Sequence, residues 1–368
     1  MLRRVLPLLL IIMLGGLAAA AQHDRSHVDS VVDKLVEGFM AKPEHVGLSI
    51  GILWRGQTYT RNYGTIEKGH NVRPGAHTIY EIASLTKSFT GILLAHAVLE
   101  GKLALGDDIR KWLPGAYPNL EYAGHPITVR DLANHTGGLP KSIPPLGQGL
   151  SPDEMAARYR DFSKADFLKA VSQIKPDTLP GTRYAYSNVG TQLIGIALET
   201  AYGCSYGELV KRYITDPRHM ARTRLELSAA DSNLLARGYD KDGRQMPDAV
   251  FWRHVPAAGY LRSTVVDLLQ YLRLNMDERD PAVALAHKPT FLNTSEDGED
   301  IGLFWFSKLM PNGYRKVDHA GGSFGFTSYC LIYRHYRLGI VCLANDASPD
   351  TEHAIRELAA AIVDELTQ

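Results

Sequence analysis

Strand-like segments occur at both ends of this chain, and a long helical and loop-rich section separates them. Residues 46–54 have the composition of a buried strand, and residues 57–63 alternate like its hairpin partner. Near the C-terminus, strands are predicted over 302–309, 314–318, 324–333 and 338–344. The pattern predicts an α+β fold in which helices flank an antiparallel sheet built from both chain ends, with a mostly helical region inserted between them.

This arrangement predicts one domain over residues 22–368, with a sheet part formed by about 22–100 and 250–368 and a helical part over about 101–249. Helices are predicted over 28–40, 189–201, 263–276 and 350–366. A site between the sheet and the helical part is an ordinary place for a pocket. The 40 basic and 40 acidic residues balance, which does not favour nucleic acid as a partner. Oligomeric state is not readable from the sequence.

The N-terminus has the organisation of a secretory signal peptide over residues 1–21. Arg3 and Arg4 precede the apolar stretch 5–17, and an alanine run ends just before Gln22. The apolar stretch is short for a bilayer span, although an uncleaved anchor is the alternative. We therefore expect a secreted or periplasmic protein with no stable membrane span after cleavage.

Cys330 and Cys342, two of the three cysteines, lie on predicted consecutive strands. They face each other only if the connecting loop has an odd number of residues, because a one-residue shift turns a side chain to the opposite face. The alternatives are a disulfide or buried free thiols.

The step Ser84-Leu85-Thr86-Lys87 begins a long, nearly uncharged segment that predicts a buried helix. Residues three apart share one face of a helix, so Lys87 is placed beside the Ser84 hydroxyl. A serine nucleophile needs a base within hydrogen-bond reach, and a desolvated lysine has a lowered pKa.

The same spacing recurs at Ser172 and Lys175, but Pro176 follows and the preceding residues predict an amphipathic surface helix capped by Ser163. This copy lacks the buried setting that the chemistry requires.

Two further segments carry candidate site residues. Tyr186 and Asn188 are two apart, so both point the same way in an extended segment. A phenol relays protons if a nearby ammonium lowers its pKa. In the second segment, His319 precedes a glycine-rich run from Gly321 to Gly325, where backbone N–H groups can approach a ligand. Taken singly, these segments also fit a helix start and a hairpin turn.

In this order, Ser-x-x-Lys, Tyr-x-Asn and His-x-Gly resemble the serine β-lactamase and penicillin-binding-protein superfamily, in its class C and DD-peptidase branch. Segments 127–140 and 258–267 resemble two further motifs of that branch, and the likeness covers most of the chain. The resemblance implies a β-lactamase/transpeptidase-like fold.

The resemblance also implies roles for individual residues. Ser84 is the nucleophile, Lys87 the base and Tyr186 a partner in proton transfer. Asn188 binds the lysine and the substrate amide, and His319 lines the pocket. The backbone N–H groups of Ser84 and Gly322 form the oxyanion hole, and Gly321 belongs to the same substrate-binding strand.

The sequence departs from the β-lactamase pattern at His319 and Ala320, where those enzymes usually carry a lysine and a hydroxyl residue. The expected activity is therefore that of a DD-peptidase-like serine hydrolase acting on D-alanyl peptides of peptidoglycan through an acyl-enzyme. An esterase or β-lactamase of the same superfamily is the alternative. No cofactor and no metal are expected.

Two rival interpretations remain open. Residues 321–325 also fit the G-x-S-x-G elbow of α/β-hydrolases, with Ser323, Asp346 and His353 in the right order, but an elbow requires a following helix. A non-catalytic penicillin-binding or sensing module is the other rival.

Overall fold

The computed structural model describes residues 24–143, 150–247, 252–294 and 298–368. The predicted signal peptide lies outside these residues, and so do residues 144–149 of the segment 142–152, which is rich in proline and glycine. In the described part of the chain, no helix combines the length and the apolar character needed to cross a membrane.

One seven-stranded antiparallel sheet dominates the fold, in the order β2-β1-β12-β11-β10-β9-β8. Its strands are β1 (Gly47–Trp54), β2 (Gln57–Gly64), β8 (Asp300–Ile301), β9 (Phe306–Leu309), β10 (Arg315–Gly322), β11 (Thr327–Tyr333) and β12 (Leu338–Ala344). The two chain ends meet where β1 pairs with β12, with Ile50 opposite Cys342. The predicted sheet built from both termini is confirmed.

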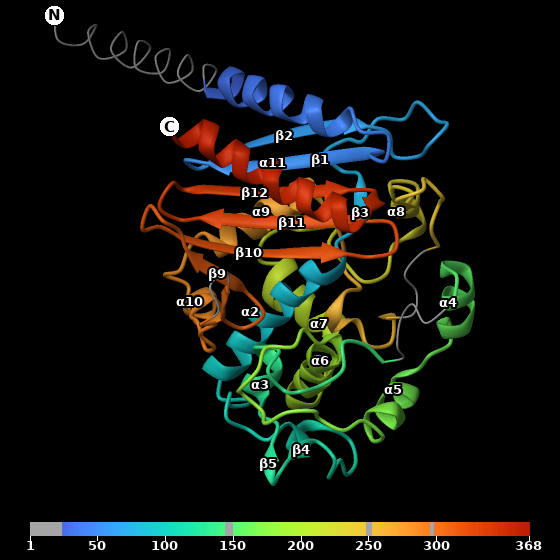
Figure 1. The fold of residues 1–368 in the computed structure, drawn as a ribbon, viewed down its shortest axis with the longest axis vertical. Helices are drawn as coiled ribbons and strands as arrows, with labels where there is room; N and C mark the ends of the chain where they lie inside the picture. The colour runs from blue at the N-terminus through green and yellow to red at the C-terminus, as the bar shows by residue number, and fades with distance from the viewer. Residues whose placement is uncertain (1–23, 144–149, 248–251, 295–297) are drawn as a thin grey trace, which may run out of the picture.

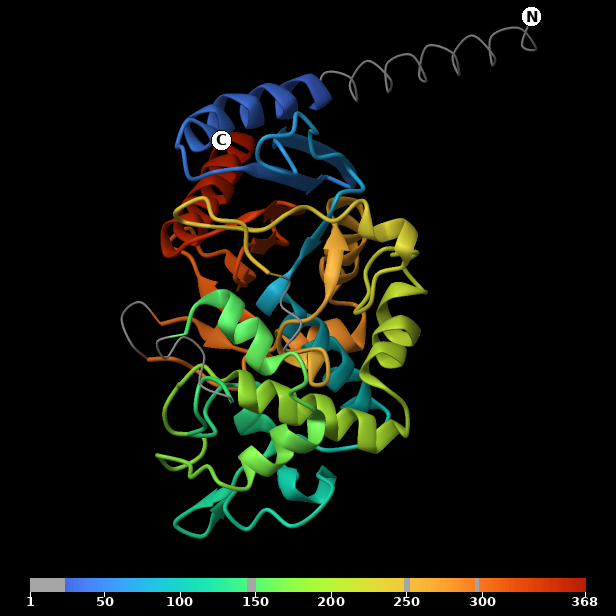
Figure 2. The same cartoon turned by 90° about the vertical axis from the view of Figure 1, so that its right-hand side faces the viewer.

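Helices cover both faces of this sheet, which explains why β1, β11 and β12 are buried along their whole length. Residues 24–40 form a helix that shares one apolar cluster with α11 (Pro349–Thr367) and one sheet face. On the other face lie α9 (Val265–Asn275) and α2 (Thr86–Leu99). Figure 1 shows α11 across the front of the sheet, and both Figures 1 and 2 show the helical region below the sheet.

The helical region and the second sheet face share a single hydrophobic core. Val341 of β12, Phe89 of α2 and Leu193 of α6 (Asn188–Tyr202) belong to one continuous cluster. The other helices are α3 (Val129–Ala133), α4 (Pro152–Tyr159), α5 (Lys164–Val171), α7 (Tyr206–Val210), α8 (Ala229–Ser232) and α10 (Pro281–His287). Short 3-10 helices are η2 (Ala83–Leu85), η3 (Ile109–Trp112) and η6 (Pro256–Ala258), and η4 (Lys211–Thr215) is a short π-helix. Short strands pair as β3 (Ile79–Glu81) with β7 (Arg262–Thr264), β4 (Glu121–Tyr122) with β5 (His125–Pro126), and β6 (Tyr239–Asp240) with β13 (Asp346–Ala347).

Several strands begin or end at other residues than predicted. The strand predicted to end at Asp318 continues to Gly322, because residues 319–322 pair with 327–330 of β11 instead of forming a turn. The predicted strand 302–309 is shortened to β9, which covers only Phe306–Leu309, and β8 precedes it at Asp300–Ile301. Cross-strand hydrogen bonding therefore outweighs the turn preference of the two glycines.

The cysteine pair does not form a disulfide. Cys330 is opposite Val341 and Cys342 is opposite Tyr329, so the two thiols are one position out of register. They belong to the apolar clusters on opposite sheet faces, and all three cysteines are free. The four residues 334–337 between β11 and β12 give the even loop that sets this register.

We expect a reducing agent to shift the melting temperature by less than about 1 °C, because no cross-link constrains the unfolded chain. Alkylation of the denatured, unreduced protein should modify all three cysteines. A protein mass showing that two cysteines remain unmodified would contradict this strand register.

Candidate active site

Ser84 lies in a short turn between β3 and α2. Ala83 before it has a left-handed backbone with φ 47°, a conformation that is costly for a residue with a Cβ atom. The turn is held by Ile82, whose N–H donates to Leu261 O at 3.0 Å and whose carbonyl accepts from Ser328 Oγ at 2.7 Å. Ser84 is partly exposed although the residues around it are buried. The backbone thus presents one hydroxyl at the edge of the core.

Lys87 is the second residue of α2, three residues after Ser84, and is completely buried. Its Nζ atom is 3.0 Å from Ser84 Oγ and donates to Ala258 O at 2.5 Å. Burial, followed by the charge of Lys141, lowers the pKa of Lys87 well below its ordinary value. A neutral amine beside a serine hydroxyl can accept its proton, which is the arrangement that the Ser-x-x-Lys step predicts.

Tyr186 lies close to both Ser84 and Lys87. Its side chain is hydrogen-bonded to Ser84, and Lys87 Nζ is 5.0 Å from the centre of its ring. Burial raises the pKa of Tyr186. The condition named from the sequence, a pKa lowered by a nearby ammonium, is therefore not met, because burial dominates the shift. A phenol with a raised pKa keeps its proton at neutral pH.

Asn188 is the first residue of α6, and Ser187 before it is the helix cap. The Asn188 amide donates to Ser142 Oγ at 3.1 Å, while its Oδ1 atom has no partner among the described residues. The predicted contact with Lys87 is replaced by this bond, since Lys87 uses the Ala258 carbonyl. Asn188 therefore lines the cleft, and its Oδ1 atom is a hydrogen-bond acceptor without a donor among the described residues.

Residues 319–322 of β10 form the opposite wall. His319 is buried, and its Nδ1 donates to the Ala320 carbonyl at 2.6 Å. Burial, followed by the charge of Lys87, lowers the pKa of His319 to about 3, so its ring is neutral at physiological pH.

The two glycines of this strand have different surroundings. A Cβ atom on Gly321 would lie 2.5 Å from Ile82 O and 2.9 Å from Leu85 N, so this glycine packs against the turn that carries Ser84. Gly322 lines the cleft together with Ser84, and a Cβ atom there would meet nothing within 4 Å. Gly321 is therefore a packing residue, whereas the oxyanion hole at Ser84 and Gly322 stays a prediction.

The site lies in one cleft with a volume of about 1330 Å³. Ser84, Tyr186, Asn188, His319 and Gly322 all line it. Sequence reasoning missed other lining residues, chiefly Lys141, Tyr184, Glu299, Phe306, Glu352 and Arg356. Their positions follow from long-range packing, and no local pattern identifies them.

The second Ser-x-x-Lys step is not a site. Ser172 ends α5 and donates to Lys169 O, and Lys175 is exposed beyond the helix. Ser163 caps α5 as predicted.

The G-x-S-x-G rival is wrong. Ser323 is followed by strand β11, not by a helix. Asp346 is bonded to His45 and Thr351, whereas His353 pairs with Glu357 on the exposed side of α11. The three residues do not form a triad.

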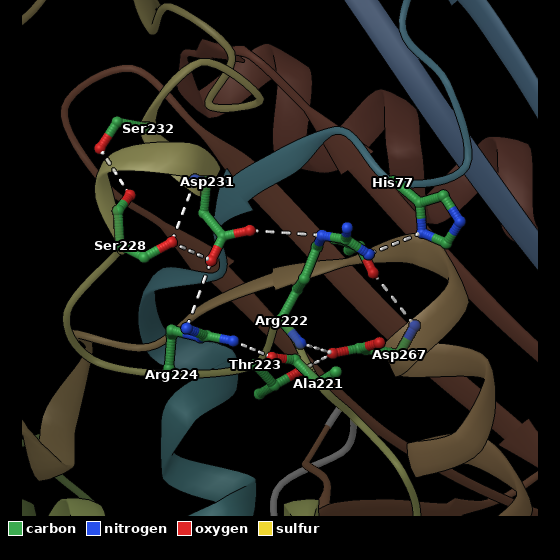
Figure 3. A network of polar contacts seen from close by, with 10 residues as sticks. His77, Ala221, Arg222, Thr223, Arg224, Ser228, Asp231, Ser232 and Asp267 are labelled. Carbon is green, nitrogen blue, oxygen red and sulfur yellow. Dashed lines mark hydrogen bonds and ion pairs between the residues drawn. The ribbon is translucent and has the colours of Figure 1, made fainter.

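A polar network supports the segment that leads from the Ala258 carbonyl into β7 and α9 (Figure 3). Asp267 accepts from Arg222 N at 2.8 Å and from Thr223 Oγ1 at 2.9 Å. Asp231 pairs with Arg222 and Arg224 at 3.4 and 3.2 Å. These bonds join residues 222–224 to the start of α9.

Replacing Asp267 with alanine is expected to lower the free energy of unfolding by about 1–3 kcal/mol, because the part-buried Arg222 N–H and the buried Thr223 hydroxyl lose the acceptor that they share. Chemical denaturation measures this loss. The exposed Asp242→Ala is the matched control, expected to change stability by less than about 0.5 kcal/mol. Equal effects of the two variants would contradict the role of the network.

Comparison with known proteins agrees with this geometry. The Beta-lactamase family matches residues 32–365. "Protein flp" of Staphylococcus aureus (strain N315) is 27% identical over 338 residues, which are 90% of this chain but 66% of that protein. A "Beta-lactamase" of Lysobacter lactamgenus is 24% identical over 91% of both chains.

Solved structures share the fold. A class C beta-lactamase superposes with a TM-score of 0.79 at 22% identity, covering 94% of this chain and 98% of the other. The Beta-lactamase/D-alanine Carboxypeptidase from Yersinia pestis, complexed with citrate, gives 0.76 at 23% identity, covering 91% and 98%. The chain therefore belongs to the Beta-lactamase family.

Proposed function

We propose that the protein is an exported hydrolase that forms an acyl-enzyme on Ser84 and cleaves D-alanyl peptides in the manner of a DD-peptidase. The observation that carries the proposal is the 3.0 Å contact between Ser84 Oγ and the desolvated Lys87 amine, beside the protonated Tyr186. The cleft of about 1330 Å³ has room for a peptide.

The geometry supports a two-step reaction. As Ser84 Oγ attacks the substrate carbonyl, neutral Lys87 takes the hydroxyl proton. When the C–N bond of the tetrahedral intermediate breaks, Tyr186 gives its proton to the leaving amine and recovers one from the Lys87 ammonium. Water then attacks the acyl-enzyme by the reverse proton path and releases Ser84.

Efficient β-lactam hydrolysis is not expected, because the β10 wall differs from that of β-lactamases. His319 is neutral and Ala320 has no hydroxyl, so neither offers the cation and donor that hold a carboxylate in β-lactamases. A Beta-lactamase/D-alanine Carboxypeptidase is also among the structures of the same fold.

An esterase is the second candidate. Tyr184, Trp252, Phe306 and Phe324 line the cleft, and aromatic walls suit small apolar acyl groups. A non-catalytic binding module is disfavoured because Ser84, Lys87 and Tyr186 are assembled as a working nucleophile, base and proton donor.

Intact-protein mass spectrometry after mixing with an acetyl-D-alanyl-D-alanine peptide, a small acyl ester or benzylpenicillin tests the proposal. We expect a transient adduct with the peptide and a persistent one with penicillin. An adduct formed only with the ester would replace the peptidase by the esterase, and no adduct with any of them would overturn both.

A further inference from the structure

Two consecutive backbone carbonyls of the short helix η6 are bound by side chains of α2. The Ala258 carbonyl accepts from Lys87 Nζ at 2.5 Å, and the Ala257 carbonyl accepts from Thr90 Oγ1 at 2.8 Å. Lys87 and Thr90 are three residues apart, so they lie on the same face of α2. The carbonyl that contacts the base therefore belongs to the segment that Thr90 holds.

A buried tyrosine extends this contact. The Tyr206 hydroxyl, from α7, lies 2.8 Å from Thr90 Oγ1, and both side chains are buried. A carbonyl only accepts and a threonine hydroxyl has one hydrogen, so Thr90 donates to Ala257 and Tyr206 donates to Thr90. Burial raises the pKa of Tyr206, so its hydroxyl keeps that hydrogen. The hydrogen bonds thus run in one direction, from α7 through α2 to η6.

Close packing surrounds η6. A Cβ atom on Gly195 of α6 would lie 2.5 Å from Ala257 Cβ, and a Cβ atom on Gly259 would overlap the ring of Trp252. The segment is therefore pressed against α6 and Trp252, and the bond from Thr90 fixes the direction of its carbonyls within that packing.

The direction of the Ala258 carbonyl matters for the chemistry of Lys87. A neutral amine has two hydrogens and one lone pair, and the lone pair must face Ser84 Oγ to take its proton. The bond to Ala258 uses a hydrogen of the amine and so orients the lone pair toward Ser84. The same carbonyl stabilises the ammonium that forms, in a place where burial disfavours its charge.

We propose that Thr90 and Tyr206 are positioning residues for the base: their hydrogen bonds hold η6 so that the Ala258 carbonyl orients the Lys87 amine and stabilises its ammonium. Neither residue is among the described residues that line the cleft, so their effect passes through Lys87 and not through contact with the substrate. This inference rests on the acyl-enzyme chemistry of the proposed function and deepens it.

Thr90→Val, which keeps the shape of the side chain but removes its hydroxyl, tests the inference in stopped-flow acylation by p-nitrophenyl acetate. The limiting acylation rate is expected to fall at least about tenfold, while the half-saturating ester concentration stays within about twofold. The midpoint of the rate–pH profile should move to lower pH by at least about 0.5 pH unit, because the ammonium loses part of its stabilisation. Thr90→Ser keeps the hydroxyl and should leave both values near the wild type, and Tyr206→Phe should change both in the same direction as Thr90→Val.

The midpoint reports Lys87, although other titratable groups interact with this side chain. They are Tyr186, His135, His319 and Lys141. Burial lowers the pKa values of the two histidines and raises that of Tyr186, so these three groups stay neutral near pH 7. Lys141 is present in every variant, so its charge does not account for a difference between them.

Tyr271→Phe is the matched control for Tyr206→Phe. Tyr271 also donates to a buried hydroxyl of α2, that of Ser88 at 3.0 Å, but Ser88 donates to Leu85 O and not to η6. The control should lower the melting temperature about as much as Tyr206→Phe and keep the wild-type midpoint.

A folded Thr90→Val enzyme with the wild-type rate and midpoint would overturn the inference, and so would a Tyr271→Phe enzyme that shifts the midpoint as Tyr206→Phe does. If Thr90→Val does not fold, Tyr206→Phe decides: an unchanged midpoint there overturns the inference. In each of these cases acylation of the wild type leaves the proposed function standing. A wild type that no substrate acylates at Ser84 would overturn the proposed function and this inference together.

Discussion

Replacing Lys87 with methionine is expected to slow acylation of Ser84 by at least about 10³-fold. Methionine has a similar length but no basic atom, so the Ser84 hydroxyl loses the group that lies 3.0 Å from its oxygen. The fold should survive, because a desolvated amine is itself unfavourable in the core. Stopped-flow acylation with a chromogenic ester, together with the melting temperature, separates the two effects.

Lys175→Met is the matched control, since Lys175 holds the same spacing to Ser172 but is exposed. It should acylate at the wild-type rate. A Lys87→Met enzyme that is well folded and still acylates at a rate near the wild type would show that another group is the base.

The pH dependence of acylation follows from the same lysine. Only the neutral amine accepts a proton, so the rate should rise with pH through the pKa of Lys87 and then level off. Because burial lowers this pKa, the plateau should begin well below 10.5, the ordinary value for lysine. A rate that still rises up to that pH would contradict a desolvated base.

Replacing Gly321 with alanine is expected to lower the free energy of unfolding by about 1–3 kcal/mol. The added Cβ atom would lie 2.5 Å from Ile82 O and 2.9 Å from Leu85 N, so the turn that carries Ser84 must move. A displacement of the nucleophile by about 1 Å costs about 10²-fold in rate, so acylation should fall as well.

Gly322→Ala is the matched control for stability, because a Cβ atom there has open space around it. Chemical denaturation of both variants should show a loss only at Gly321. Equal losses at the two glycines would mean that β10 is sensitive to any added side chain, and that the close approach to Ile82 is not the cause.

The parts of the site that depend on local geometry could be predicted from the sequence. Ser84 and Lys87 share a helix face because they are three residues apart, and the uncharged residues after them imply burial. The sheet could be predicted as well, since alternation at both chain ends is a local pattern that survives folding.

The other features of the site and the sheet depend on tertiary contacts, which no local sequence pattern shows. The Ala258 carbonyl that binds Lys87 is 171 residues away, and Ser142 that binds Asn188 is 46 residues away. The raised pKa of Tyr186 could not be predicted either, because the burial that causes it depends on tertiary packing. The extent of β10 was also missed, because pairing with β11 decides it.

The central claim is that Ser84 is the nucleophile, and peptide mapping after labelling with a fluorophosphonate probe tests it most directly. We predict a single adduct on the peptide that contains Ser84, lost in Ser84→Ala and retained in Ser172→Ala and Ser323→Ala. A label that persists in Ser84→Ala, or that disappears in Ser323→Ala alone, would contradict the account.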